Sequence, residues 1–197
     1  MKITTHSLKE AKASGKKITA LTAYDCPTAK LLDEAGVDIV LIGDSVGNVL
    51  LGYENTIPVT MEEMLHHTKA VVRGVKNAMV IADMPFMSYQ LNPESALSGA
   101  SKFVKEAGAN GVKIEGDVYI DAIKKIIEAG IPVMGHLGLT PQLVNQLGGY
   151  RVQGKTPDEA KAILEGAKNL EKAGVFCLVL EMVPSLLAKK ITQTLSI

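Results

Sequence analysis

The sequence predicts an α/β protein whose parallel strands form a β/α barrel, and three observations lead to this prediction. Short apolar runs recur along the chain, as expected for strands that are buried on both faces. Four of these runs follow a helix-like segment that ends in Ala-Gly, a common helix stop. Each run then ends in a polar residue a few positions after the glycine: the four pairs are Gly36 and Asp44, Gly108 and Glu115, Gly130 and His136, and Gly174 and Glu181.

The polar residues at the strand ends are expected to share one rim. The carboxyl ends of the strands of a β/α barrel lie on one face, which is where such proteins keep their chemistry. Asp44 follows the apolar run 39–42 directly, and a carboxylate is almost never fully buried unless it is paired or bound to a metal. The alternative is four unrelated buried strands that end in solvated residues.

Turn and cap signals place the remaining elements in order. Ser7 with Glu10 predicts a capping box at the start of a first helix, and Thr60 with Glu63 predicts another. The segment between 46 and 58 is a long loop, which in a compact domain is usually functional. Strands are expected at 17–23, 39–42, 78–83, 111–115, 132–136 and 177–181. Helices are expected at 7–15, 27–35, 60–75, 93–107, 158–173 and 184–195, and a further helix is expected to end at 129.

Composition predicts a single cytoplasmic domain over residues 1–197. Hydrophobic residues make up 47% of the chain and charged residues 21%, which is ordinary for a globular protein. The 21 basic and 21 acidic residues form no blocks, so neither nucleic acid nor an anionic membrane is an expected partner. Cys26 and Cys177 have no metal-ligand spacing and are expected to be reduced. No apolar run approaches the ~20 residues of a membrane span.

The rim collects three carboxylates, from Asp44, Asp83 and Glu115. Converging carboxylates repel one another, so the pKa of at least one of them should rise unless a divalent cation binds. Oxygen ligands favour a hard ion such as Mg²⁺, which can polarise a carbonyl group. His136 could instead shift the preference towards Zn²⁺ or Mn²⁺, and this alternative stays open.

Two further side chains suggest a reaction class. Lys113 and Glu115 are two apart and therefore lie on the same face of their strand, either as an ion pair or facing a substrate. A lysine in the mouth of a barrel can hold a carboxylate or an oxyanion. Glu181 is then the candidate base for removing a proton next to a carbonyl group. These residues indicate a metal-assisted enzyme that forms an enolate or a carbon–carbon bond.

At these residues the sequence resembles the ketopantoate hydroxymethyltransferase family. The resemblance covers nearly the whole chain in order, and several of the motifs are long enough to be specific. The matching segments are 41–48 (LIGDSVGN), 81–86 (IADMPF), 112–116 (VKIEG), 135–142 (GHLGLTPQ), 148–150 (GGY), 152–154 (VQG) and 180–184 (LEMVP).

The resemblance implies transfer of a hydroxymethyl group from 5,10-methylenetetrahydrofolate to 3-methyl-2-oxobutanoate, which gives 2-dehydropantoate for pantothenate synthesis through a Mg²⁺-stabilised enolate. It implies that Asp44 and Asp83 ligate the metal and contact the substrate, and that Glu115 completes the metal environment. Ser45 and Lys113 would hold the substrate carboxylate, and Glu181 would remove the C3 proton. His136 lies in a matching motif without an assigned role. A homo-oligomer, typically a decamer, is also implied.

The resemblance further implies a TIM (β/α)₈-type barrel of the phosphoenolpyruvate/pyruvate-like superfamily. Such a barrel typically needs about 250 residues, and only six strand–helix units can be counted in this chain, so the last two units of the family are expected to be absent. Two alternatives follow. One is a non-catalytic subunit that binds metal and keto acid. The other is a lyase of the isocitrate lyase group, although the Lys-Lys-Cys-Gly-His-like motif of those enzymes is missing.

Overall fold

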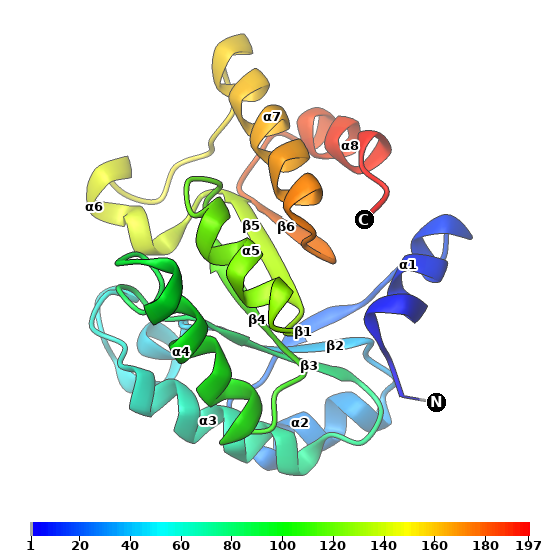
Figure 1. Cartoon of the computed structure of the whole chain (residues 1–197), viewed down its shortest axis with the longest axis vertical. Coiled ribbons are helices and arrows are strands. Elements are labelled where there is room, and N and C mark those ends of the chain that lie inside the picture. The colour runs from blue at the N-terminus through cyan, green and yellow to red at the C-terminus, as the bar shows by residue number, and fades with distance from the viewer. Residues whose placement is uncertain (1) are drawn as a thin grey trace.

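A computed structural model describes residues 2–197 and shows strands and helices in regular alternation (Figure 1). The strands are β1 (Ala20–Thr22), β2 (Ile39–Ile42), β3 (Met79–Asp83), β4 (Gly111–Glu115), β5 (Val133–Gly138) and β6 (Cys177–Glu181). The longer helices are α1 (Thr5–Ala13), α2 (Cys26–Glu34), α3 (Met61–Gly74), α4 (Pro93–Lys105), α5 (Ile120–Glu128), α7 (Pro157–Ala173) and α8 (Ser185–Thr194). Three short elements complete the fold: the π-helix η1 (Gly47–Leu51), the 3₁₀-helix η2 (Pro141–Leu143) and α6 (Val144–Leu147).

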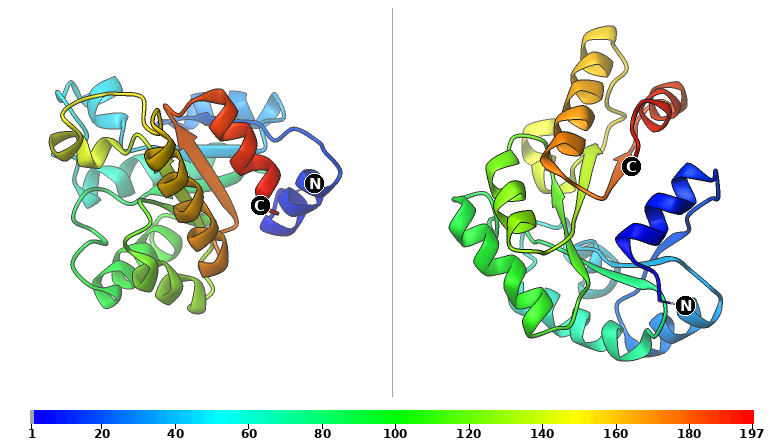
Figure 2. Two further views of the ribbon diagram at one scale, coloured as in Figure 1. Left: turned by 90° about the horizontal axis from the view of Figure 1, so that it is seen from above. Right: turned by 45° about the vertical axis from the view of Figure 1, so that its right-hand side comes forward.

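All six strands belong to one parallel sheet, in the order β1-β2-β3-β4-β5-β6. The sheet curves into part of a barrel, and α2, α3, α4, α5 and α7 cover its outer side (Figures 1 and 2). The expected succession of β/α units is therefore confirmed as far as six units. The register aligns strand ends: Asp83 pairs with Lys113, Glu115 with His136, and Gly138 with Glu181.

The two faces of the sheet carry different residues because successive strand side chains point to opposite sides. On the outer face, residues such as Val40, Val80 and Val112 belong to the large apolar core beneath the helices. On the inner face, Ile39 and Met79 join a smaller cluster, which Leu8 of α1 also enters. Continuing that inner alternation brings Asp83, Glu115, His136 and Glu181 to the mouth of the curved sheet. Asp44 lies two residues beyond β2 and reaches the mouth through the turn that follows the strand.

The edge strands β1 and β6 are not paired with each other. On this side of the molecule α1 and α8 lie close together (Figure 2), where Lys12 Nζ donates to the carbonyl oxygens of Thr192 and Ile197 at 2.7 and 2.8 Å. The side chains of β1 are all exposed, and Leu21 is 52% exposed. Within residues 2–197, no helix combines the length and apolar character needed to cross a membrane.

Local signals predicted most helix starts but misplaced the first. The capping box at Thr60 and Glu63 is confirmed, with Glu63 N donating to Thr60 Oγ1 at 3.2 Å. The predicted box at Ser7 and Glu10 is wrong, because Thr4 caps α1 and Ser7 is its N3 partner. A Thr–Ser pair can close a capping box as a Ser–Glu pair does, so the N-cap lies three residues earlier than predicted, at Thr4.

Two other segments differ from the sequence prediction. The first strand begins at Ala20, three residues later than expected, because only Ala20–Thr22 pair with β2. The loop between 46 and 58 contains the π-helix η1, followed by a left-handed Gly52 with φ of 77°. A π-helical turn is rare and often lies at a functional site.

Asp33, at the end of α2, holds the turn that leads into β3. Its carboxylate accepts hydrogen bonds from the backbone N–H groups of Lys76, Asn77 and Ala78 at 3.1, 2.9 and 2.8 Å. Burial alone would raise the pKa of Asp33, but these hydrogen bonds outweigh burial and lower it. The carboxylate thus fixes where β3 starts, and with it the position of Asp83 at the other end of the strand.

Replacing Asp33 by Asn should lower the free energy of unfolding by about 1–3 kcal/mol at pH 7, because buried N–H donors lose their charged acceptor. The pKa of Asp33 is lowered in the folded state, so its stabilisation exists above the unfolded value of about 3.9 and is lost as pH falls through the folded pKa. The difference in the free energy of unfolding between wild type and Asp33→Asn should therefore be smaller at low pH. Urea unfolding of both proteins at pH 7 and pH 3 measures this difference.

The matched control is Glu34→Gln. Glu34 is the next residue along α2, is exposed, and forms only an exposed pair with Lys30 at 3.9 Å. Its effect should stay below about 0.5 kcal/mol at either pH. An Asp33→Asn variant that is as stable as wild type at pH 7 would contradict the role given to this carboxylate.

Candidate active site

A cavity of about 310 Å³ lies at the carboxyl ends of the strands. Every candidate site residue named from the sequence lines it: Asp44, Ser45, Asp83, Lys113, Glu115, His136 and Glu181. The expectation that the strand-end residues share one rim is confirmed. The functional roles given to them stay predictions. The rest of the lining is mainly apolar or hydroxylic: Thr22, Leu41, Gly43, Asn48, Thr56, Pro141, Tyr150 and Val179.

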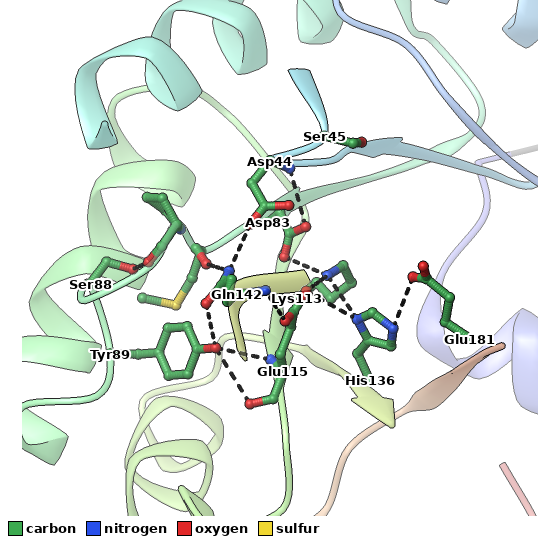
Figure 3. A network of polar contacts seen from close by, with 12 residues as sticks. Asp44, Ser45, Asp83, Ser88, Tyr89, Lys113, Glu115, His136, Gln142 and Glu181 are labelled. Atoms are coloured by element: carbon green, nitrogen blue, oxygen red, sulfur yellow. Dashed lines mark hydrogen bonds and ion pairs between the residues drawn. The ribbon is translucent and has the colours of Figure 1, made fainter. Parts of the chain in front are cut away.

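Asp44, Asp83 and Glu115 form a group of three carboxylates whose nearest oxygens all lie within 4.8 Å of one another. They come from the ends of β2, β3 and β4, and all three side chains are buried. The backbone N–H of Asp44 donates to Asp83 Oδ2 at 3.2 Å, which ties the first two strand ends together (Figure 3). This donor set consists of oxygen atoms in one small volume, as a hard divalent cation requires.

Lys113 supplies a positive charge beside the carboxylates. Its Nζ lies 2.7 Å from Asp83 Oδ1 and 3.5 Å from Glu115 Oε1, and the residue is only 4% exposed. Burial would lower the pKa of this lysine, but Asp83 and Glu115 outweigh burial and raise it, so Lys113 is charged. The sequence left two alternatives for Lys113, an ion pair or a side chain that faces a substrate. The structure shows the ion pair, and Lys113 also lines the cavity.

The three carboxylates differ in their preferred protonation state. Burial and the charge of Asp83 raise the pKa of Asp44 well above its ordinary value. Burial also raises the pKa of Asp83, although Lys113 opposes this effect. For Glu115, burial is outweighed by a hydrogen bond from His136 and by Lys113, and the pKa is lowered. The expectation that at least one of these carboxylates has a raised pKa is confirmed, most clearly at Asp44.

His136 joins the carboxylate group to Glu181. Its Nδ1 lies 3.3 Å from Glu115 Oε1, and its Nε2 lies 3.2 Å from Glu181 Oε2 (Figure 3). Burial and Lys113 lower the pKa of His136, but hydrogen bonds to the two glutamates outweigh them and raise it. Glu181 is thus the accessible end of this series of close polar contacts, since its side chain is 39% exposed.

The backbone around Glu181 is also constrained. Gly138 has φ of 94°, and a Cβ atom at this position would collide with the carbonyl oxygen of Glu181. That oxygen accepts a hydrogen bond from Leu139 N at 2.8 Å. Met182 follows with φ of 45°, a left-handed conformation that is uncommon for a residue other than glycine. Non-glycine residues in this conformation cluster at functional sites, and here the strain lies next to the candidate base.

Ser45 lies apart from the charged network in Figure 3. Its Oγ is 2.8 Å from the hydroxyl of Tyr24, which follows β1. The carbonyl oxygen of Tyr24 is in turn 2.8 Å from Nδ1 of His67 on α3. Ser45 is thus held at the cavity wall by a neighbouring strand end, and its hydroxyl retains hydrogen-bonding capacity for a ligand.

Gln142 is the main site residue that sequence reasoning missed. It is buried in η2, and its side chain donates to Asp44 Oδ2 at 2.8 Å and to the carbonyl oxygen of Met84 at 2.9 Å. Its backbone N–H donates to Glu115 Oε2 at 3.1 Å. The residue closes the matching segment 135–142, so that motif was the available signal, but nothing local in it points to Asp44.

The cysteines take no part in this site. Cys26 starts α2 and Cys177 starts β6, and both are free. Burial raises the pKa of Cys177 to about 12, which keeps its thiol protonated and unreactive.

The sequence profile of the ketopantoate hydroxymethyltransferase family matches residues 2–197. A curated relative, 3-methyl-2-oxobutanoate hydroxymethyltransferase of Thermoanaerobacter sp. (strain X514), is 58% identical over 197 residues. The alignment covers all of this chain and 72% of the relative. The alignment therefore spans every element and every candidate site residue described above.

Two solved structures resemble the fold at low sequence identity. The crystal structure of 2,3-dimethylmalate lyase, a member of the PEP mutase/isocitrate lyase superfamily, has a TM-score of 0.68 and 17% identity, covering 98% of this chain and 67% of that protein. Phosphonopyruvate hydrolase, solved in complex with oxalate and Mg²⁺, has a TM-score of 0.67 and 16% identity, covering 90% and 62%. These similarities concern the fold alone. The profile match and the level of identity over the whole chain show that the chain belongs to the ketopantoate hydroxymethyltransferase family.

Proposed function

We propose that this chain transfers a hydroxymethyl group from 5,10-methylenetetrahydrofolate to 3-methyl-2-oxobutanoate and forms 2-dehydropantoate. The observation that carries the proposal is the gathering of Asp44, Asp83 and Glu115 beside Lys113 and Glu181, in a chain of this family. The net reaction consumes one water molecule, whose oxygen becomes the new hydroxyl group. The folate co-substrate and the keto acid belong to this proposal together with the metal.

The donor set fits Mg²⁺. Three carboxylates offer oxygen atoms within 4.8 Å of one another, and the pKa values of Asp44 and Asp83 remain raised although Lys113 lies beside them. Asp44, Asp83 and Glu115 would hold the ion. When bound, Mg²⁺ would polarise the keto group of the substrate and offset the negative charge of its enolate. A fold neighbour solved with Mg²⁺ and oxalate, a small dicarboxylate, supports the same kind of ligand pair in this architecture.

Glu181 is proposed to remove the proton from C3 of the keto acid. It is the most accessible acid of the site, on the far side of His136 from the metal ligands. Its Oε2 lies 3.2 Å from His136 Nε2, and the close approach of Gly138 fixes the backbone at Glu181. Proton removal places the electron pair in an enolate conjugated with the keto oxygen. C3 then bonds to the one-carbon unit of the folate, both carbon–nitrogen bonds of that unit break, and water supplies the hydroxyl oxygen. The C3 proton and one proton of the water end on the two nitrogens of tetrahydrofolate.

Ser45 and Lys113 are proposed to hold the carboxylate end of the substrate. The Nζ of Lys113 is charged and borders the cavity, and the Ser45 hydroxyl is oriented by Tyr24. The apolar part of the cavity wall, including Leu41 and Val179, would contact the two methyl groups of 3-methyl-2-oxobutanoate. Polar contacts at one end and apolar contacts at the other would orient C3 towards Glu181.

We also propose that the six units are part of a single (β/α)₈ domain of the phosphoenolpyruvate/pyruvate-like superfamily. The unpaired edges of β1 and β6 and the exposed β1 support this, because parallel edges are normally covered by further strands. A homo-oligomer, a decamer in this family, and a cytoplasmic location are part of the same proposal.

Proton NMR of 3-methyl-2-oxobutanoate in D₂O tests the enolate step. The C3 proton should exchange in the presence of the protein and Mg²⁺, and exchange should stop when the ion is removed with EDTA. Addition of methylenetetrahydrofolate should then yield 2-dehydropantoate. A folded protein that binds the ion and catalyses neither exchange nor transfer would contradict the proposed activity for this chain.

Glu181→Gln should slow the C3 exchange by about 10²–10⁴-fold, the usual contribution of a general base. Affinity for Mn²⁺, used as a spectroscopic probe, should change less than twofold because Glu181 is not in the carboxylate group. Glu165→Gln, an exposed acid on α7 paired only with Lys168, is the matched control and should exchange at the wild-type rate. If Glu181→Gln exchanges the C3 proton at the wild-type rate, Glu181 is not the base that removes this proton.

Asp44→Asn should weaken divalent-metal binding at least tenfold and also stabilise the metal-free protein. The pKa of Asp44 is raised in the fold, so its ionised form opposes folding at pH values above about 3.9, its unfolded value. Removing that charge should therefore raise the metal-free thermal midpoint at pH 7 by a few degrees, and the gain should vanish near pH 3. Thermal unfolding with EDTA and with Mg²⁺ measures both effects.

Asp121→Asn removes the same charge from an exposed position on α5 and serves as the control. It should leave metal binding unchanged and should not stabilise the protein. Loss of stability in metal-free Asp44→Asn would show that this carboxylate contributes a net favourable interaction, contrary to the assignment.

A further inference from the structure

We propose that Gln142 is a positioning residue that fixes two of the carboxylates, Asp44 and Glu115, in the arrangement a divalent cation needs. This inference rests on the proposed metal-dependent function. The residue reaches Asp44 at the end of β2 through its side chain and Glu115 at the end of β4 through its backbone N–H. One residue of η2 thus connects strand ends on either side of β3.

The orientation of the Gln142 amide is set by its surroundings. Nε2 faces two acceptors, the carboxylate of Asp44 and the carbonyl oxygen of Met84, at 2.8 and 2.9 Å. Oε1 faces two donors, the hydroxyl of Tyr89 and Nε2 of Gln90, at 2.8 and 3.1 Å. A flipped amide would oppose donor to donor and acceptor to acceptor on both sides, so only one orientation fits.

The partners of Gln142 are themselves attached to the site. Tyr89 is 1% exposed, and its hydroxyl oxygen also lies 3.3 Å from the backbone nitrogen of Glu115, which donates to it (Figure 3). The carbonyl oxygen that accepts from Gln142 belongs to Met84, the residue after Asp83. The amide therefore contacts, directly or through one neighbour, the backbone or side chain of all three carboxylate residues.

This arrangement suits a group that holds ligands rather than one that reacts. Gln142 uses all of its amide hydrogen-bonding capacity within the protein, so none is left for a substrate. Its side chain and its backbone N–H each hold one carboxylate oxygen, of Asp44 and of Glu115, at hydrogen-bond distance. Hydrogen bonds from outer residues orient metal ligands in this way, and losing them typically costs 10–100-fold in affinity.

Gln142→Met tests the inference, because methionine has a similar length and no amide. The probe is Mn²⁺, with the free ion measured by electron paramagnetic resonance on the full chain. The dissociation constant for Mn²⁺ should rise 10–100-fold. Activity should recover towards the wild-type kcat at saturating Mg²⁺, while the Mg²⁺ concentration for half-maximal activity rises. A role in general stability alone would lower the thermal midpoint without changing the affinity of the folded protein.

Gln146→Met is the matched control, four residues further along and exposed, and should bind Mn²⁺ as wild type does. If Gln142→Met does not fold, Gln142→Asn keeps the amide but draws it back by one carbon, and the same loss is expected. Either variant, once folded, overturns the inference if it binds Mn²⁺ within twofold of wild type. Wild-type protein that fails to bind Mn²⁺ would instead overturn the metal-dependent function, and this inference with it.

Discussion

The burial of three carboxylates around one lysine is the constraint on which the rest of this structure depends. Asp44, Asp83 and Glu115 are all nearly inaccessible, and Lys113 supplies a positive charge beside Asp83 and Glu115. Removing charged groups from water is costly unless partners restore the lost interactions. The fold supplies these partners through parallel strand ends in register, through backbone N–H groups and through the amide of Gln142.

Much of this site could be predicted because the strand period and the parallel sheet are regular. An apolar run followed by a polar residue locates a strand end, and parallel strands gather their ends at one edge. Asp44, Asp83, Lys113, Glu115, His136 and Glu181 could all be placed at that edge in this way. The first capping box was misplaced because several hydroxyl side chains lie within one turn of each other near residues 4–7.

The remaining contacts could not be predicted because they join segments that are far apart in the chain and irregular in structure. Gln142 lies 98 residues from Asp44, and Tyr89 lies 53 residues from Gln142. Both follow strands in loops or short helices, where no periodicity indicates which way a side chain points. The pairing of Tyr24 with Ser45 likewise depends on β1 lying beside β2, which the sequence does not specify residue by residue.

The division of the sheet into two faces explains how the protein tolerates such a site. The outer face of the strands is apolar and packs beneath the helices, so the main core is built without the rim residues. The inner face becomes polar only towards the strand ends, above a small cluster that includes Ile39, Met79 and Met134. The burial that raises the pKa of Asp44 means that its ionised form opposes folding. This unfavourable free energy arises at the cavity and does not involve the packing of the main core. A divalent cation at the rim would relieve it, so metal binding and stability should be coupled.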